Sequence, residues 1–471
     1  MVMNSMSIVR KGWFSVLVFS ATLLVQAAEQ PNILFIAVDD LRPELGCYGA
    51  DYMITPNIDR LAGEGVLFER AFCNYPVCGA SRASLMTGLR PSPTRFISYK
   101  SRADQDAAGI PDLAATLKKA GYRTINNGKI YHDRTDNEDS WDEIFRPKEF
   151  CQYFNDENLK LIPADVQYGP GLKGCPYEAA DEPDESYQGA VVAAKAIEEL
   201  KRAKKSGKPV FITAGFSKPH LPFNCPQKYW DMYPAENISM PDNFFVPTNA
   251  PSEAIHDFNE IRSFHGVPET GPLPEEMALN LIRGYRACTT FTDAMIGRVF
   301  DTMDELEMWD DTIVILWGDH GWQLGEHTLW CKHANFNTSL QVPLMVRAPG
   351  KAANDTMALV ELVDLYPTIC DLAGIEKPNH LEGKSFVPVL DKPSLDWKNA
   401  VFGRYKLGDS IRTDRYLYTE WKNKKGERTA SMLYDHKVDP DENNNVAGHP
   451  EYSDVVKRLS MELKAGWPHL Q

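Results

Sequence analysis

The sequence predicts an α/β fold: an α/β/α sandwich with a large, mainly parallel central sheet, followed by a smaller C-terminal antiparallel sheet subdomain with a terminal helix. Two observations predict this arrangement. Continuous apolar runs of strand length alternate with amphipathic helical patterns up to residue 375. Beyond that point, short strand-like runs follow one another directly. We therefore expect a large domain over residues 28–375 and an α+β subdomain over residues 376–471.

Three apolar runs, rich in β-branched residues, have the composition of strands that are buried on both faces. They lie at residues 31–38, 209–216 and 312–318. Such strands are typical of parallel sheets whose two faces are both covered by helices. Residues 341–349 form a further apolar run, which we also predict to be a strand.

Three amphipathic patterns between these runs predict helices. The first, at 110–122, has Pro111 near its start and Gly121 after its end, where each residue type is favoured. The second, at 186–207, ends in a basic turn, which complements the negative end of the helix dipole. The third, at 277–306, is the longest.

The rest of the chain divides into loops and a C-terminal sheet. Residues 145–180 and 224–274 are rich in Pro, Asn and Gly, and we predict long loops over the sheet there. The C-terminal subdomain is predicted from strand-like runs at 400–405, 410–421 and 429–435 and from a helical pattern at 451–464.

The N-terminus has the pattern of a secretory signal peptide. Arg10 and Lys11 precede an apolar stretch at 12–25, and Val25 and Ala27 occupy the −3 and −1 positions of a cleavage site. The alternative is a membrane anchor, for which the apolar stretch is short. We therefore predict that residues 1–27 are removed and that the protein is secreted or periplasmic.

Charge excludes some classes of partner. The formal net charge of −15 argues against nucleic acid and against an anionic membrane surface after signal cleavage. It leaves an anionic substrate open, because a basic pocket can lie within an acidic surface.

The chain has nine cysteines, an odd number, so at least one stays unpaired. Cys151 and Cys175 bracket a Gly- and Pro-rich loop, and we predict a disulfide between them. We predict that most of the other cysteines are buried thiols.

Polar side chains follow each of the three apolar strands. Asp39 and Asp40 end the first, Lys218 and His220 follow the second, and Asp319-His320 ends the third. Ligands of open α/β sheets bind beyond the carboxyl ends of the strands. One such strand end alone is commonly a simple turn, but three of them in one sheet predict a ligand-binding site.

A cysteine motif identifies the chemistry. CGASR at 78–82, with Thr87-Gly88 after it, resembles the signature C-x-P/A-S-R…TG of the sulfatase family. Four further segments resemble that family's elements in the same order: Asp39-Asp40, GKIYH at 128–132, KPH at 218–220 and DHG at 319–321 with Lys332. The GK-x-x-H spacing and the segment 319–336 are most similar to the iduronate 2-sulfatase branch of the family.

The resemblance implies a modified nucleophile. In this family the cysteine, here Cys78, is oxidised to formylglycine (3-oxoalanine), whose hydrate attacks sulfur with one hydroxyl and expels sulfate with the other. The partner that performs the oxidation is a formylglycine-generating enzyme or an anaerobic sulfatase-maturating enzyme. Ala80 stands where most members have proline, a variant found notably with the anaerobic radical maturase.

The same positions predict a metal site. Carboxylates of Asp39, Asp40 and Asp319 are hard oxygen ligands that suit Ca²⁺ or Mg²⁺ better than zinc. His320 stands where many sulfatases carry Asn. The resemblance to the iduronate branch, which also has His there, implies one Ca²⁺ ion held by these four residues and residue 78.

The resemblance also assigns catalytic roles to basic residues. Arg82 orients the nucleophile, and Lys129 and Lys332 bind sulfate oxygens. His220 protonates the leaving oxygen, and His132 accepts a proton during sulfate release. Lys218, in the same element as His220, completes the catalytic set.

The predicted substrate is a sulfated carbohydrate, from which a sulfate is removed in exo fashion, for example from a uronic acid. Arg95, Trp322 and His333 are candidates for the sugar pocket, although Trp322 equally suits the core. One alternative function is a phosphomonoesterase or phosphodiesterase of the alkaline-phosphatase-like superfamily. Another is a glycan-binding protein with an unmodified Cys78.

Overall fold

The computed structural model describes residues 30–147, 153–162, 174–257 and 259–466. The predicted signal peptide at 1–27 lies outside these residues. Cys151 also lies outside them, so its predicted pairing with Cys175 stays a prediction. Within the described ranges, no helix combines the length and the apolar character needed to cross a membrane.

A central sheet of eight strands confirms the predicted α/β fold. Its order is β14 (Asn354–Thr356), β2 (Val66–Phe68), β13 (Leu344–Arg347), β9 (Thr312–Gly318), β1 (Asn32–Val38), β7 (Val210–Phe216), β4 (Arg123–Asn127) and β5 (Glu143–Phe145). The strands from β9 to β5 are parallel, and β1 lies between β7 and β9. The three apolar runs therefore form the middle of the sheet.

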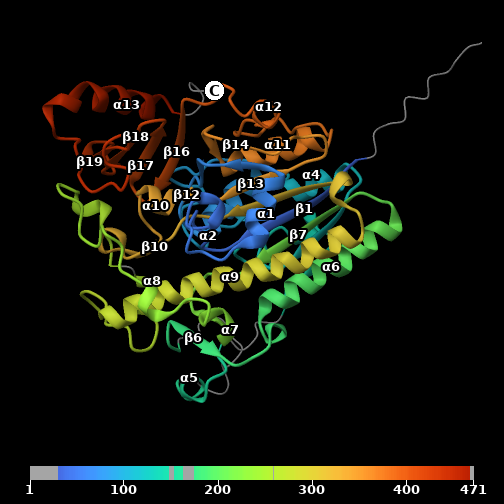
Figure 1. Cartoon of the computed structure of the whole chain (residues 1–471). Helices are drawn as coiled ribbons and strands as arrows, with labels where there is room; N and C mark the ends of the chain where they lie inside the picture. The colour runs from blue at the N-terminus through green and yellow to red at the C-terminus, as the bar shows by residue number, and fades with distance from the viewer. Residues whose placement is uncertain (1–29, 148–152, 163–173, 258, 467–471) are drawn as a thin grey trace, which may run out of the picture.

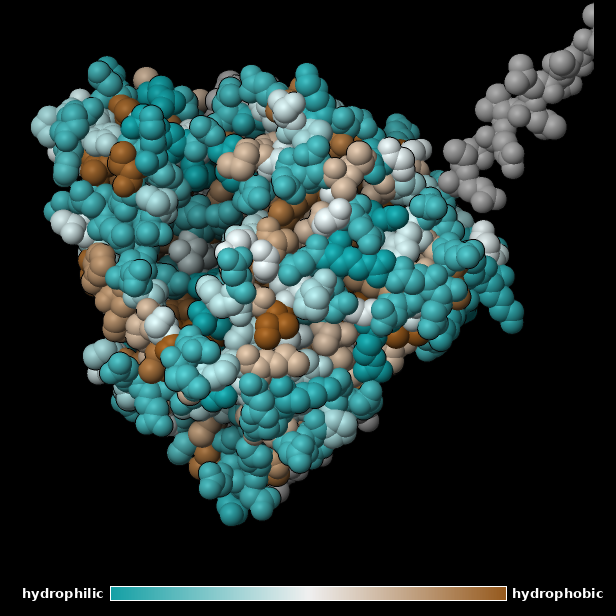
Figure 2. Space-filling view, in the orientation of Figure 1, coloured by the Kyte–Doolittle hydropathy of each residue, from teal (hydrophilic) through white to brown (hydrophobic). Residues whose placement is uncertain are grey.

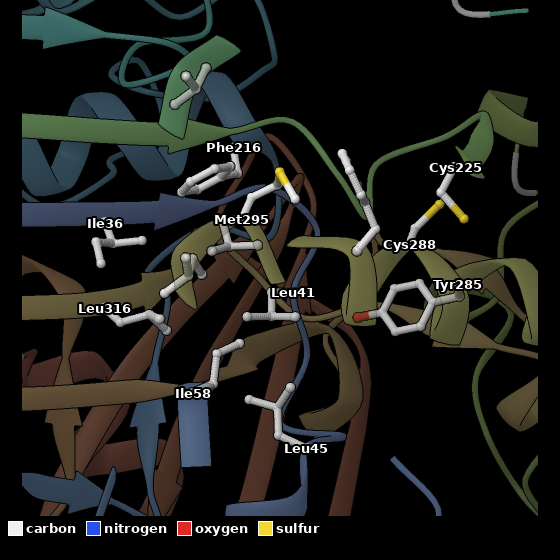
Figure 3. Close-up of a cluster of buried hydrophobic side chains, with 14 of the residues drawn as sticks. Ile36, Leu41, Leu45, Ile58, Phe216, Cys225, Tyr285, Cys288, Met295 and Leu316 are labelled. Atoms are coloured by element: carbon white, nitrogen blue, oxygen red, sulfur yellow. The ribbon is translucent and has the colours of Figure 1, made fainter. Parts of the chain in front are cut away.

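Helices cover both faces of this sheet, as predicted (Figure 1). Successive residues of a strand point to opposite faces, so Ile36 and Phe35 pack into two different hydrophobic cores. Figure 3 shows part of the first core, around Ile36 and Leu316. Its helices are α1 (Pro56–Glu64), α6 (Gln188–Ser206) and α9 (Glu275–Glu305), and the opposite face carries α4 (Leu113–Lys119), α11 (Leu365–Leu372) and α12 (Val387–Asp391).

The segment 341–349 differs from the single strand that we predicted. It is divided at Pro343 into β12 (Gln341–Val342) and β13, which belong to different sheets. Proline has no N–H to donate within a strand ladder, which explains the break. β13 then runs antiparallel to β9, so the sheet is mixed on this side.

The predicted long loops contain short elements. Around 145–180 these are α5 (Asp156–Lys160) and β6 (Tyr177–Ala180). Around 224–274 they are β8 (Phe223–Pro226), α7 (Gln227–Trp230) and α8 (Asn259–Arg262). β6 and β8 pair in parallel, which joins the two loop regions.

The C-terminal sheet is antiparallel, with its four strands in chain order. They are β16 (Ala400–Tyr405), β17 (Gly408–Thr413), β18 (Tyr416–Lys422) and β19 (Arg428–Asp435), and α13 (Ser453–Ala465) follows them. The predicted run 410–421 is therefore two strands joined by a tight turn. Leu459 of α13 is buried against Ile411 and Tyr418 of the sheet. The face shown in Figure 2 is mainly hydrophilic.

A buried cluster of charges joins Arg90, just after Gly88, to Lys398, just before the C-terminal sheet. The Glu361 carboxylate accepts from Arg90 and, at 2.8 Å, from Lys398, and Lys398 also contacts Asp364 at 2.6 Å. Burial by itself raises the pKa of Glu361, but Arg90 and Lys398 hold that pKa well below its ordinary value.

Replacing Glu361 with Gln is expected to lower the free energy of unfolding by about 3–5 kcal/mol, because the buried Arg90 loses its counter-charge and Lys398 keeps only that of Asp364. Since the folded-state pKa lies below the unfolded-state value, this contribution is present above the unfolded-state pKa. It is lost as the pH falls towards the folded-state pKa. Denaturant unfolding at neutral and acidic pH measures both effects. The control is Glu382→Gln, whose partly exposed pair with Arg95 contributes less than about 1 kcal/mol. Equal losses in the two variants would contradict the assignment.

Candidate active site

The carboxylates that end β1 and β9 lie together. Val38 is opposite Gly318 in the parallel register, so the residues that follow them leave the sheet side by side. The Asp40 N–H donates to the Asp319 Oδ1 atom at 3.0 Å. Asp40 has a φ of 59°, a left-handed conformation that turns the chain sharply at the strand end. Asp39, Asp40, Asp319 and His320 are all fully buried.

Cys78 begins α2 (Cys78–Thr87), whose N-terminus points at these carboxylates. Its Sγ atom lies 3.2 Å from His320 Nε2. Gly79 allows this placement, because a Cβ there would lie 2.2 Å from the carbonyl oxygen of Tyr99. Burial raises the pKa of the Cys78 thiol well above its ordinary value, so the unmodified side chain is a neutral thiol.

Arg82, one turn along α2, bridges two of the carboxylates. Its Nε atom donates to Asp319 at 2.8 Å, and a terminal nitrogen donates to Asp39 at 3.1 Å. Its other terminal nitrogen donates to the carbonyls of Lys129 and Ile130 at 2.5 and 3.1 Å. Arg82 therefore holds the strand ends and the GK segment in one arrangement.

Two glycines place Lys129 beside Asp39. Gly128 has a φ of 79°, and a Cβ on it would lie 2.2 Å from the Gly215 carbonyl oxygen. A Cβ on Gly215 would lie 2.4 Å from the Lys129 nitrogen. The GK segment thus packs directly against the end of β7, and the Lys129 ammonium pairs with the Asp39 carboxylate.

Lys332 pairs with the second carboxylate of this strand end, Asp40, together with a residue that the sequence did not reveal. Its Nζ atom lies 3.0 Å from Asp40 Oδ1 and 2.9 Å from Glu260 Oε1. The same Glu260 oxygen lies 3.2 Å from His220 Nε2. Burial alone raises the pKa of Glu260, but Lys332 and His220 hold it well below the ordinary value. Glu260 lies within the predicted loop 224–274 and belongs to no motif, so only its position in space marks it.

Glu260→Gln is expected to lower kcat by about 10–100-fold, because an amide holds Lys332 and His220 less firmly than a carboxylate does. Steady-state kinetics on a sulfate ester, with thermal unfolding as the check on folding, measures this. Glu253→Gln is the matched control, since Glu253 lies exposed in the same long loop. A turnover equal to that of the wild type in Glu260→Gln would refute the role.

The carboxylates of the donor set fit a hard cation. Asp39, Cys78, Asp319 and His320 each offer one ligand atom, and these atoms lie within 4.8 Å of one another. Asp40 belongs to an overlapping group with His220. Burial raises the pKa of Asp40 despite the nearby His220 and Lys332, so negative charge here is incompletely balanced by the chain itself. A divalent cation bound by carboxylate oxygens would balance it.

His132 and Lys218 occupy different surroundings at the site. Burial lowers the pKa of His132 to about 3, with Lys129 adding to the effect, so its imidazole is neutral. Lys218 donates instead to backbone carbonyls of its own loop, at 3.2 Å to His220 and also to Pro222. Lys218 therefore stabilises the loop that carries His220.

The three candidates for a sugar pocket lie in three settings. Trp322 is 1% exposed and packs in the core beneath the Lys332 ammonium, 4.8 Å from its ring, which fits the core interpretation. Arg95 contacts the Arg90 carbonyl and Glu382, not the carboxylate cluster. Of the three, His333 alone is adjacent in sequence to a residue of the site, Lys332. Its ring centroid lies 5.8 Å from that of Tyr405, which belongs to the C-terminal sheet.

Comparison with known proteins agrees with this geometry. The model of the sulfatase family matches residues 31–375, and the model of the N-sulphoglucosamine sulphohydrolase C-terminal region matches residues 325–466. The chain is 33% identical to iduronate 2-sulfatase of Mus musculus, over 87% of this chain and 88% of that protein. It is 32% identical to the Homo sapiens enzyme, over 75% and 71%.

Among solved structures, BT4656 in complex with D-glucosamine-2-N,6-O-disulfate superposes with a TM-score of 0.75 at 22% identity, covering 93% of this chain and 97% of that one. The phosphonate monoester hydrolase of Agrobacterium radiobacter has a TM-score of 0.75 at 24% identity, covering 92% and 95%. These two likenesses concern the fold. The family match over most of the chain and the identity to two iduronate 2-sulfatases show that this chain belongs to the sulfatase family of sulfuric ester hydrolases.

Proposed function

We propose that the protein is an exported, calcium-dependent carbohydrate sulfatase that removes a sulfate in exo fashion from a uronic acid or a related sugar unit. The observation that carries the proposal is the convergence of Cys78 with three buried aspartates and His320, flanked by Lys129 and Lys332. The identity to iduronate 2-sulfatases supports the choice of sugar.

The proposed chemistry needs two groups besides the encoded side chains, a Ca²⁺ ion and a formylglycine at residue 78. Asp39, Asp40, Asp319 and His320 would hold Ca²⁺, which supplies positive charge to the sulfate ester. Residue 78, as formylglycine made by a maturating enzyme, supplies as its hydrate two hydroxyls on one carbon. Its position at the start of α2, next to His320, supports this role.

The basic residues of the chain then have separate tasks. The ammonium groups of Lys129 and Lys332 lie on two sides of the carboxylates and bind the sulfate oxygens. His220, held by Glu260 at 3.2 Å, donates a proton to the leaving sugar oxygen. His132, neutral because it is buried, accepts a proton at residue 78 during sulfate release.

The sugar itself is proposed to lie against His333 and the first hairpin of the C-terminal sheet. Tyr405 packs beside both His333 and Tyr75, with ring centroids 5.8 and 5.7 Å apart. The Lys406 N–H donates to the Tyr75 hydroxyl at 3.1 Å, which anchors the hairpin next to the cysteine segment. The C-terminal subdomain therefore provides one wall of the proposed sugar site.

Sulfate release from defined disaccharides of heparan, dermatan, ulvan and carrageenan tests the proposal. We expect release from a substrate with a sulfated uronic acid at its non-reducing end. Release from none of the four classes by an enzyme that cleaves p-nitrophenyl sulfate would refute the carbohydrate assignment.

A phosphoester or phosphonate hydrolase is the second candidate, favoured by 29% identity to a multifunctional alkaline phosphatase superfamily protein of Trinickia caryophylli. Matched aryl esters of sulfate, phosphate and phenylphosphonate discriminate the two. A kcat/KM higher for a phosphorus ester than for the sulfate would favour the second candidate.

A further inference from the structure

Helix α9 and strand β8 approach one another unusually closely behind the active site. The contact point is Gly284, where a Cβ would lie 2.9 Å from the Cβ of Phe223 and 3.0 Å from the ring of Trp230. Only glycine allows the two elements to pack at this distance without one of them shifting. The close approach has a consequence for two cysteines nearby.

Cys288 lies four residues after Gly284, on the same face of α9, and Cys225 lies two residues after Phe223, on the same face of β8. The packing that joins Gly284 to Phe223 therefore brings the two thiols together. Both residues are 0% exposed. Their side chains are hydrogen-bonded to each other, which adds to the rise that burial causes in the pKa of Cys225. Figure 3 shows the two sulfur atoms side by side.

We propose that Cys225 and Cys288 form a disulfide in the mature protein. Each thiol loses a proton and the pair loses two electrons, which pass to an external disulfide such as oxidised glutathione or a thiol oxidase. That oxidant is reduced to two thiols while one S–S bond forms in the protein. Because both sulfurs are buried, the exchange takes place while the chain folds. The inference rests on the proposed export, because such bonds persist in an oxidising compartment.

The crosslink would lie where it can stabilise the catalytic loop. The loop with Lys218 and His220 runs directly into β8, and α9 already holds both site loops. Thr292 donates to the Lys218 carbonyl at 3.1 Å, and the Tyr285 hydroxyl donates to the Asp40 carbonyl at 2.9 Å. A covalent bond between β8 and α9 fixes the far end of the loop to the same helix. The inference does not depend on the substrate.

Tryptic mapping tests the bond directly. Cleavage after Lys and Arg, except before Pro, leaves Cys225 as the only cysteine of peptide 206–228 and Cys288 as the only cysteine of peptide 287–298. Full-length protein produced in an oxidising compartment is denatured, alkylated without reductant and digested. The expected result is one linked species of these two peptides that separates on reduction. Peptide 352–384, with Cys370 as its only cysteine, serves as an internal control and should appear alkylated.

Recovery of peptides 206–228 and 287–298 as separate, alkylated species without reductant would overturn the proposal. A second measurement uses protein that is unfolded and then refolded with or without a phosphine reductant, because the buried bond is out of reach in the folded protein. Refolding with the reductant should lower the midpoint of thermal unfolding of the wild type by several degrees, because a crosslink that closes a long loop is lost. The variant with Cys225→Ser and Cys288→Ser should show a smaller response than the wild type, because the predicted Cys151–Cys175 bond is the one target left in it. An equal response in both proteins would also contradict the bond.

Discussion

Replacing Cys78 with Ala is expected to abolish sulfate release, with a loss of at least about 10³-fold in kcat, while the fold stays intact. The side chain belongs to both groups of candidate metal ligands and lies 3.2 Å from His320. Steady-state kinetics on p-nitrophenyl sulfate and on the sugar substrate measures the loss. Near-UV circular dichroism checks that the tertiary packing is unchanged.

The matched control is Cys370→Ala, which removes a buried thiol on α11 that belongs to neither group of candidate metal ligands. It should retain turnover and lose stability only. The same experiment tests the modification. The tryptic peptide 71–82 contains Cys73 and Cys78, so active protein should carry a single alkylated cysteine, Cys73, after reduction and alkylation. Two alkylated cysteines in fully active protein would refute the formylglycine assignment.

Removal of the metal is expected to have the second largest effect. Chelation should abolish turnover and lower the midpoint of thermal unfolding, and added Ca²⁺ should restore both. Asp39, Asp40 and Asp319 are fully buried, so without a cation their negative charges repel one another with little screening by solvent. A ligand that binds only the folded state stabilises it increasingly as its concentration rises above Kd. Activity and unfolding measured across a calcium titration check the prediction.

Two aspartate variants separate this effect from general destabilisation. Asp319→Asn should remove the response of the unfolding midpoint to calcium, because an anionic ligand is lost. Asp293→Asn should keep the response, although it disturbs a buried carboxylate that accepts from the N–H groups of Asn57 and Ile58. If chelation left turnover and unfolding of the wild type unchanged, the calcium assignment would be wrong. If zinc alone restored turnover, His320 would point to a softer metal.

The wall of the proposed sugar site and its basic residues combine segments that are far apart in the sequence. Glu260 contacts Lys332 and His220 although no motif includes it. Tyr405 reaches His333 from the C-terminal sheet. Trp322 lies within a motif segment and yet belongs to the core. Sequence resemblance identifies positions within motifs, and it has no means to identify a residue that reaches the site through the packing of a long loop.

The sequence by itself determined the middle of the sheet, the main helices and the family. Apolar runs at 31–38, 209–216 and 312–318 are readable because a strand that is buried on both faces must be apolar at every position. The tertiary structure alone decided the break at Pro343, the contacts of Glu260 and the proximity of Cys225 to Cys288. Each of these depends on which surfaces pack together although they are far apart in the sequence. The local periodicity of apolar residues does not determine that packing.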